Sequence, residues 1–335
     1  MATDRAFSVC VKGFPGADHA LRSLERTVGL TRHFSLASTN PRSPEVRFLA
    51  QHLREQRPAL LVLGAWTPLY ESFVDALAGL DTRIAVYWTS TAAQGDISEE
   101  VAKLVRMLHA GRTQYLFCAS DDLASALRGR VAGVLGLPPT LVWPRARVTG
   151  VRRTTGRPTV SLFFPAAETR RKNVTNALLA VAALRTPPRL LLNGLSARPG
   201  YRELLEVLGI GYHDLGWIED RRRYERTLSR VDVGLQPSLT ESYDYVAAEH
   251  LSRGVPVVGS SAVPALARLP REIRRALVVD DVDGHAGIRD KLQALLDDPA
   301  ARHTIGRRAA DAVRELNERD IRRAARALRT VLDRG

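Results

Sequence analysis

Short apolar runs alternate with amphipathic helical periods through the first 145 residues of this 335-residue chain. Such runs indicate buried strands, and apolar recurrences three and four residues apart indicate helices. The predicted strands are 7–11, 33–36, 59–64, 83–88 and 115–119, and the predicted helices are 17–27, 44–57, 69–80, 98–110 and 121–127. This order predicts a doubly wound parallel sheet, in which ligands bind beyond the carboxyl ends of the strands.

A second alternating region follows residue 158. Its predicted strands are 159–164, 189–192, 212–215, 232–236, 255–258 and 277–279, and its predicted helices are 173–184, 201–208, a helix from 221, 245–253 and most of the last 45 residues. We therefore expect an α/β chain of two Rossmann-like domains, 1–145 and 158–312. A polar, basic linker, 146–157, joins them, and a helix, 313–335, ends the chain.

Residues 237–258 place two carboxylates in a loop–helix–strand segment. Seven residues separate Glu241 from Glu249, and Gly254 suits the position after the helix. Glu241 is expected near the helix start and Glu249 two turns along, close to the same face. Backbone N–H groups at a helix start bind phosphate oxygens. A phosphate between two hydroxyl-binding carboxylates predicts a sugar-nucleotide site.

This segment resembles the donor-binding signature of the family-4-type retaining glycosyltransferases (glycosyltransferase group 1) of the GT-B fold. That signature is PS-x-x-E-G-F-G, then E, then G-x-P-V-V, and its matches are Pro237, Ser238, Glu241, Glu249, Gly254, Pro256, Val257 and Val258. The resemblance implies that Glu241 binds hydroxyls of the donor sugar and that Glu249 binds the ribose. In the GT-B fold the last helix often crosses back to the first domain.

The chain departs from the signature at Ser242, Tyr243 and Asp244, which replace Gly-Phe-Gly. The backbone N–H groups of these three residues are expected to meet the donor diphosphate. Asp244 brings a negative charge to the same place, so the identity of the donor stays open between UDP- and GDP-sugars, and between hexoses and pentoses.

The resemblance also implies cations for the diphosphate. Lys172 and Asn173 match the family's Lys-Asn helix start, whereas Phe164-Pro165 replaces its Gly-Arg, so the arginine role passes to Arg170 or Arg171. Cations at a helix start are unfavourable unless an anion binds there. The loops after the next strands are expected to hold the nucleotide, through Asn193 and Gly194 and through Trp217 and Ile218.

Three loops of the first domain follow predicted strand ends. The glycine-containing loop 12–16, with Gly13 and Gly16, lets backbone approach a ligand or simply forms a tight turn. Two further loops carry the expected acceptor-binding residues, which are Trp66, Trp88, Ser90, Thr91 and Gln94. The two tryptophans alternatively cover the sheet edge. The histidine that the family often has in the latter loop is absent.

The composition of the chain limits the classes of partner that it is expected to bind. The formal net charge is +13, with +4 in residues 1–150 and +9 in residues 151–335. Such a charge favours polyanionic partners, although base composition of the gene would also enrich arginine. Cys10 and Cys118 fall in apolar runs, which fits a reducing cytoplasm, and no apolar run is long enough to span a membrane. The Asp-x-Asp at 281–283 lies in a predicted loop and is interpreted as no metal site.

The predicted activity is metal-independent transfer of a sugar from a nucleotide-sugar donor to a hydroxyl, with retention implied by the resemblance. The leading acceptor is a hydroxylated, hydroxymethyl-type base in duplex or single-stranded DNA, as in phage-like base modification. A cell-envelope glycan or lipid-linked sugar at an anionic membrane surface is the alternative. A third possibility is a non-catalytic GT-B protein that only binds nucleotide or polyanion. The oligomeric state is left open.

Overall fold

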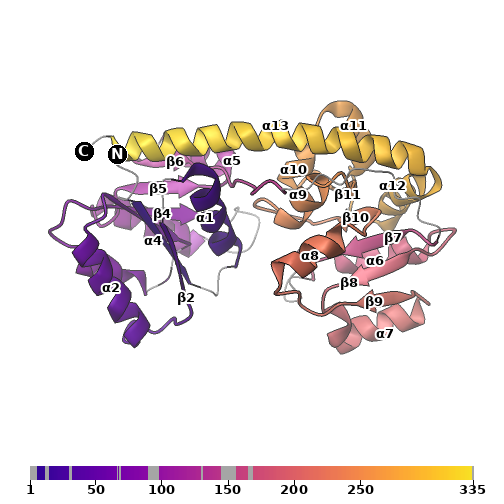
Figure 1. The fold of residues 1–335 in the computed structure, drawn as a ribbon, viewed down its shortest axis with the longest axis horizontal. Helices are drawn as coiled ribbons and strands as arrows, with labels where there is room; N and C mark the ends of the chain where they lie inside the picture. The colour runs from indigo at the N-terminus through magenta and orange to yellow at the C-terminus, as the bar shows by residue number, and fades with distance from the viewer. Residues whose placement is uncertain are drawn as a thin grey trace. The chain divides into compact units, whose positions relative to one another are not determined.

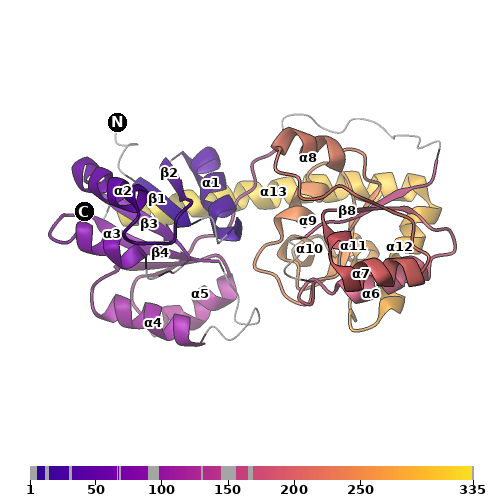
Figure 2. The same cartoon turned by 90° about the horizontal axis from the view of Figure 1, so that it is seen from below.

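The computed structural model describes residues 6–11, 15–29, 32–65, 67, 69–89, 98–129, 131–144, 156–164 and 169–333. The chain divides into two compact units, one of residues 1–142 with 317–335 and one of residues 143–316. Each unit contains a six-stranded sheet in which all paired strands are parallel. Figures 1 and 2 show the two sheets with their covering helices.

The first unit has the strand order β2-β1-β3-β4-β5-β6. Its strands are β1 (Ala6–Val11), β2 (Arg32–Leu36), β3 (Leu60–Gly64), β4 (Arg83–Trp88), β5 (Tyr115–Cys118) and β6 (Val134–Gly136). Its helices are α1 (Pro15–Val28), α2 (Pro44–Gln56), α3 (Tyr70–Ala76), α4 (Ser98–His109) and α5 (Asp121–Arg128).

Side chains alternate across β1, as the period of a strand requires. Phe7, Val9 and Val11 pack in one hydrophobic cluster with residues of α2, α3, α4 and α5. Cys10 lies on the other face, where Gly64 has no room for a side chain because Leu21 of α1 and Cys10 would both lie within 3 Å of an added Cβ. The sheet is thus covered on both faces, as a parallel sheet usually is.

The second unit has the strand order β12-β11-β10-β7-β8-β9. Its strands are β7 (Thr159–Leu162), β8 (Arg189–Leu192), β9 (Tyr212–Asp214), β10 (Val233–Gln236), β11 (Val257–Ser260) and β12 (Val278–Val279). Its helices are α6 (Val174–Ala182), η3 (Leu195–Ala197), α7 (Pro199–Val207), α8 (Arg221–Leu228), α9 (Tyr245–Leu251), α10 (Pro264–Ala267), α11 (Arg271–Leu277) and α12 (His285–Asp297).

The last helix, α13 (Pro299–Leu332), begins in the second unit, and its residues from 317 onward group with the first. The Asn317 side chain accepts from the Leu141 N–H at 2.7 Å and donates to the Leu141 carbonyl at 2.8 Å. Arg323 pairs with Asp121 at 2.6 Å. These contacts join the last part of α13 to Leu141 and to the start of α5, both of which belong to the first unit. Within the part of the chain that the structure describes, no helix has the length and apolarity that crossing a membrane requires.

The fold class expected from the sequence, two doubly wound parallel sheets, is confirmed. Differences concern short elements: β6, α10 and α11 were not predicted, and β11 begins at Val257 rather than 255. The shift has a local cause. The Val255 N–H is used to close α9, bonding to the His250 carbonyl at 3.1 Å, and Pro256 has no N–H, so ladder pairing starts at Val257. Residues 146–155, which are most of the predicted linker 146–157, lie outside the described residues.

Candidate functional site

The strand order of the second unit reverses between β7 and β10. The chain runs outward from β7 through β8 to β9 and then returns to β10 on the other side of β7. Loops that leave the carboxyl ends of two such neighbouring strands diverge, and ligands of doubly wound sheets bind in the resulting crevice. The loop after β7 carries Arg171 and Lys172, and the loop after β10 carries Glu241 and Asp244. These are residues that the sequence singled out.

Two cations and two carboxylates from these loops form one cluster. The Lys172 Nζ lies 2.5 Å from Glu241 Oε1 and 3.2 Å from Asp244 Oδ2, and the Arg171 Nη1 lies 2.8 Å from Glu241 Oε2. The side chains of Lys172, Glu241 and Asp244 are at most 5% exposed, whereas that of Arg171 is 21% exposed. We call these four residues the paired-charge cluster; their formal charges sum to zero.

Backbone contacts fix this cluster. The Leu239 N–H donates to the Arg171 carbonyl at 2.8 Å, and the Arg171 guanidinium donates to the Thr240 carbonyl at 3.0 Å. Asn173 adopts left-handed backbone angles (φ 54°) before α6, a conformation that asparagine tolerates better than most residues. These contacts hold the loops after β7 and β10 against one another.

Proximity changes the ionisation of the cluster. Burial and the Asp244 carboxylate raise the pKa of Glu241 above its ordinary value, against the opposite effect of Lys172 and Arg171. Burial alone would lower the pKa of Lys172, but Asp244 and Glu241 outweigh it and raise that pKa. Lys172 therefore stays protonated at neutral pH. The cation pair that sequence reasoning assigned to an external anion is neutralised in this structure by carboxylates of its own chain.

Glu249 sits in a different ion pair from Glu241. Its Oε1 lies 2.5 Å from Arg221 of α8, and its side chain is 3% exposed. Arg253 donates to the Glu249 backbone carbonyl at 2.9 Å and lies 3.4 Å from Glu225. The two predicted sugar-nucleotide carboxylates thus have separate partners, instead of facing one open site. Arg221, the partner of Glu249, is 43% exposed.

Helix α9 begins at Tyr245, where the sequence predicts its start, and it ends at Leu251, two residues before the predicted end. Asp244 precedes it with φ 61°, and its carboxylate accepts the Ala247 N–H at 3.0 Å. Tyr243 is 8% exposed and packs against Tyr245 with ring centroids 4.7 Å apart. Ser242 is half-buried in the preceding loop. The helix start that was expected to receive phosphate is therefore capped by Asp244 itself.

The loops after β8 and β9 meet at Asp214, which sequence reasoning missed. Its Oδ1 accepts the N–H groups of Gly194 at 2.5 Å and Gly216 at 3.0 Å, and its Oδ2 accepts the N–H and hydroxyl of Ser196 at 2.8 and 2.7 Å. Burial alone would raise the pKa of Asp214, but these hydrogen bonds outweigh it and lower the pKa. Both glycines have positive φ, 101° and 65°.

The predicted nucleotide-binding residues flank this point. Asn193 accepts the Phe164 N–H at 3.0 Å through its side chain, and Trp217 is 62% exposed beside a half-buried Ile218. An exposed indole next to fixed backbone groups can stack on a nucleotide base. Arg170, in contrast, is exposed and makes no ion pair among the described residues, so Arg171 is the better placed arginine.

In the first unit, Gly13, Trp66, Ser90, Thr91 and Gln94 lie outside the described residues. Gly16 lies in the first turn of α1, where an added Cβ would meet nothing within 4 Å. Trp88 is 3% exposed and packs in the hydrophobic cluster of the sheet, which leaves its indole no surface for an acceptor in this structure.

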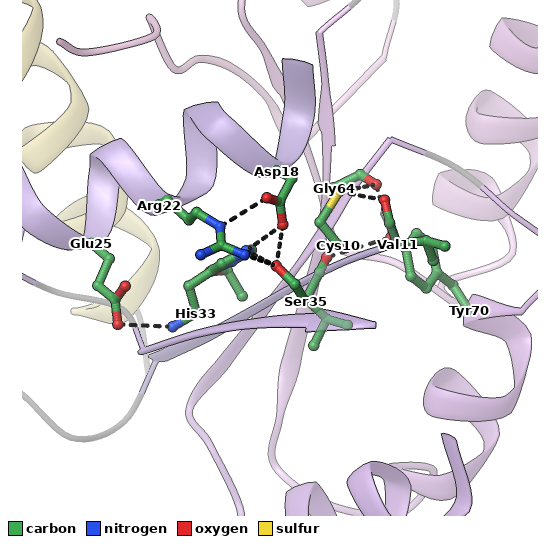
Figure 3. Close-up of polar contacts among 11 residues, drawn as sticks. Cys10, Val11, Asp18, Arg22, Glu25, His33, Ser35, Gly64 and Tyr70 are labelled. Atoms are coloured by element: carbon green, nitrogen blue, oxygen red, sulfur yellow. Dashed lines mark hydrogen bonds and ion pairs between the residues drawn. The ribbon is translucent and has the colours of Figure 1, made fainter. Parts of the chain in front are cut away.

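The first unit also contains a polar network that sequence reasoning did not identify (Figure 3). Asp18 of α1 accepts from Arg22 at 2.8 Å and lies 2.9 Å from His33 Nε2, and the Ser35 hydroxyl donates to the same carboxylate. Ser8 lies 2.9 Å from His33 Nδ1. The order Ser–His–Asp resembles a hydrolytic triad, but Ser8 is 0% exposed, so the network joins α1 to β1 and β2 rather than presenting a nucleophile.

Comparison with known proteins identifies the family. Residues 119–330, more than half of the chain, match the sequence family described as family 4 glycosyltransferase in conflict systems. The chain belongs to this family. The D-inositol 3-phosphate glycosyltransferase of Arthrobacter sp. (strain FB24) is 44% identical over 82 residues, which are 24% of this chain and 18% of that protein. The match thus spans less than a fifth of the curated relative's length.

Solved structures extend the likeness to the whole fold. Sucrose-phosphate synthase from Thermosynechococcus elongatus superimposes with a TM-score of 0.71 over 99% of this chain and 100% of its own, at 16% identity. Anabaena Alr3699/HepE, solved with UDP and glucose, has a TM-score of 0.69 over 94% of this chain and 98% of its own, at 14% identity. The fold is GT-B.

Within this family 4 chain, the Asp-x-Asp segment has a structural role. The Asp281 carboxylate accepts the Asp283 N–H at 2.9 Å, and the Val282 carbonyl accepts from Asn173 at 2.6 Å and Asn176 at 3.2 Å. These bonds fasten the loop after β12 to the start of α6. Among the residues that the structure describes, no group of three or more His, Cys, Asp or Glu side chains is arranged to hold a metal ion.

Proposed function

We propose that this protein is a metal-independent, retaining glycosyltransferase that takes a sugar from a UDP- or GDP-sugar. The observation that carries the proposal is the convergence of Arg171, Lys172 and Glu241 beyond the carboxyl ends of β7 and β10, at the reversal of strand order. That is the position at which doubly wound sheets bind nucleotides. The UDP and glucose bound by Anabaena HepE support the same class of donor.

Each residue has a chemical task in this proposal. Negative charge grows on the leaving diphosphate as the glycosidic bond breaks, and Arg171 with Lys172 stabilises it. Glu241 accepts hydroxyl groups of the sugar, and Glu249 accepts those of the ribose. Donor binding exchanges the present ion pairs for contacts with phosphate and hydroxyl groups. An oxygen of the leaving diphosphate takes the acceptor proton, so the route needs no separate acid and nucleophile.

For the acceptor we favour a hydroxymethyl-type base in DNA. Besides the net charge of +13, the support is a row of arginines on α13, here called the arginine stripe: Arg319, Arg322, Arg326 and Arg329. Their spacings of three, four and three residues place them on one helix face about 15 Å long. All four are exposed, and none has an ion pair among the described residues. Such a row suits contacts with successive phosphates.

The second candidate acceptor is a glycan or lipid-linked sugar of the cell envelope. Its support is a similar solved structure, the lipopolysaccharide outer core galactosyltransferase WaaB, which has a TM-score of 0.60 at 12% identity. Membrane insertion by α13 is not part of this candidate, because its apolar residues Ala324, Leu328 and Val331 are at most 1% exposed and already packed inside the protein. Only electrostatic attraction to anionic lipid would remain.

The test is a screen of UDP- and GDP-sugars against DNA containing hydroxymethylated bases, beside a panel of envelope acceptors. We expect transfer to the modified DNA, and an Arg171→Ala variant to lose about 10²–10³-fold in rate. Glu241→Gln, which keeps the shape but removes the charge, should abolish transfer. Arg185→Ala, which removes an exposed arginine paired with Asp297, is the matched control and should leave the rate unchanged.

The outcomes separate the possibilities. Transfer to an envelope acceptor alone would replace the DNA assignment and keep the enzyme. Nucleotide binding without transfer or donor hydrolysis would identify a non-catalytic binder. Near-normal turnover in both Arg171→Ala and Glu241→Gln would contradict the assignment of the site.

A further inference from the structure

Asp244 sets the net charge of the paired-charge cluster. With Glu241 alone, Arg171 and Lys172 would leave the cluster with one net positive charge; Asp244 reduces that to zero. The Asp244 side chain is 1% exposed, and its Oδ2 lies 3.2 Å from Lys172 Nζ. In such a dry place a charge acts strongly on its neighbours, because little water screens it. Any phosphate that approaches Lys172 therefore competes with a carboxylate that is already bound.

The backbone conformation at Asp244 and a helix-cap hydrogen bond hold its carboxylate beside Lys172. Asp244 has φ 61°, in the left-handed region, and its other oxygen, Oδ1, accepts the Ala247 N–H at 3.0 Å. One carboxylate oxygen thus caps α9 while the other pairs with Lys172. The side chain cannot swing away from an incoming phosphate without giving up the helix cap.

The competition discriminates between two ligands of the proposed reaction. In a nucleotide sugar the pyrophosphate is substituted at both ends and carries about two negative charges, whereas the nucleoside diphosphate left after transfer has a free terminal phosphate and carries close to three at neutral pH. Repulsion by a fixed carboxylate grows in proportion to the charge of the ligand. A carboxylate beside Lys172 therefore disfavours the product more than the donor.

We propose that Asp244 is a specificity-determining residue that weakens the hold of Lys172 and Arg171 on the leaving nucleoside diphosphate, so that product is released in preference to donor. This inference rests on the proposed function, because it takes the ligand of the cluster to be a pyrophosphate. It assigns Asp244 no contact with the sugar. Its effect is on binding through the charge of the cluster.

The test compares Asp244→Asn with the unchanged protein by calorimetric titration with UDP, UDP-glucose, GDP and GDP-mannose. Asparagine keeps an oxygen for the Ala247 N–H and tolerates positive φ. The variant therefore keeps the helix cap and removes the negative charge together with the acceptor that faces Lys172. We expect the affinity for the nucleoside diphosphate to rise at least about tenfold, and that for the corresponding nucleotide sugar to rise less. Asp244→Gly, which also permits φ 61°, should act in the same direction if the asparagine variant folds poorly.

Asp298→Asn is the matched control. Asp298 is exposed and accepts the Ala300 and Ala301 N–H groups at the start of α13, so this variant removes one carboxylate from a helix cap elsewhere in the same unit. It should leave both affinities unchanged. The inference is overturned if Asp244→Asn binds diphosphate no more tightly than the unchanged protein, or gains equally for diphosphate and nucleotide sugar. Absence of nucleotide binding in every variant would overturn the proposed function together with it.

Discussion

At the scale of single residues, Asp214 shows what sequence patterns leave out. The roles of Glu241 and Lys172 were inferred from motif letters, and the structure brings these two side chains together. Asp214 belongs to no sequence motif. Its partners are the backbone N–H groups of Gly194, Ser196 and Gly216, and a backbone N–H group leaves no signature in a sequence because nearly every residue has one. An acid at a strand end two residues before a glycine was the only available signal. Hydrogen bonds to a carboxylate stabilise more than neutral ones do.

We expect Asp214→Ala to weaken nucleotide binding about tenfold or more and to destabilise the fold by about 2 kcal/mol, because three loop N–H groups lose their acceptor. Asp214→Asn keeps one acceptor oxygen and should show a smaller effect on both. Nucleotide titration and thermal unfolding measure the two effects. Unchanged binding in Asp214→Ala would show that the loops after β8 and β9 do not hold the ligand.

At the scale of elements, helix α9 is fastened to the sheet by His250, which is 0% exposed. Its Nδ1 lies 2.7 Å from the Val246 carbonyl, an acceptor, so Nδ1 carries the proton. Nε2 then accepts from the Ser161 hydroxyl of β7 at 2.7 Å. Gly234 of β10 leaves room for the ring, since an added Cβ there would come within 3.1 Å of it. The helical pattern of 245–253 predicted the helix, but the partner of its histidine depends on strand order.

This arrangement predicts acid sensitivity. Burial lowers the pKa of His250, so the unfolded chain binds a proton at a higher pH than the folded one does. The contribution of neutral His250 to stability is therefore complete above about pH 6.5 and declines as the pH falls below it, by up to about 1.4 kcal/mol per pH unit. Denaturant unfolding between pH 5 and pH 8 should show a smaller pH slope in His250→Gln than in the unchanged protein. Equal slopes would mean that His250 does not titrate on unfolding.

At the scale of the whole molecule, composition gives the net charge directly but does not show on which surface the charge lies. The net charge of +13 predicts polyanion binding but names no surface. In the structure many arginines are paired, including Arg171, Arg221 and Arg323, whereas the arginine stripe on α13 has no ion pair among the residues that the structure describes. The position of the stripe follows from helix α13 burying its apolar face against the first unit.

If the stripe contacts DNA, replacing Arg322, Arg326 and Arg329 with alanine should weaken duplex binding and reduce the slope of log affinity against log salt by up to about 2.7, at about 0.9 per phosphate contact. Arg271, Arg274 and Arg275 of α11 are also exposed, and their alanine variant is the charge-matched control. It should change the slope less. Fluorescence anisotropy across a salt series measures both, and equal slopes in the two variants would leave the stripe without a specific role.

By itself, the sequence determined the alternation of strands and helices, the parallel fold class and the residue types of the donor segment, because these depend on local periodicity and on the spacing of neighbours along the chain. Only the tertiary structure decided which charges meet. Lys172 and Glu241 are 69 positions apart in sequence, and their contact, like the separation of Glu249 from both, follows from the adjacency of β7 and β10. Long-range pairing of buried charges is set by strand order and burial, which no local pattern encodes.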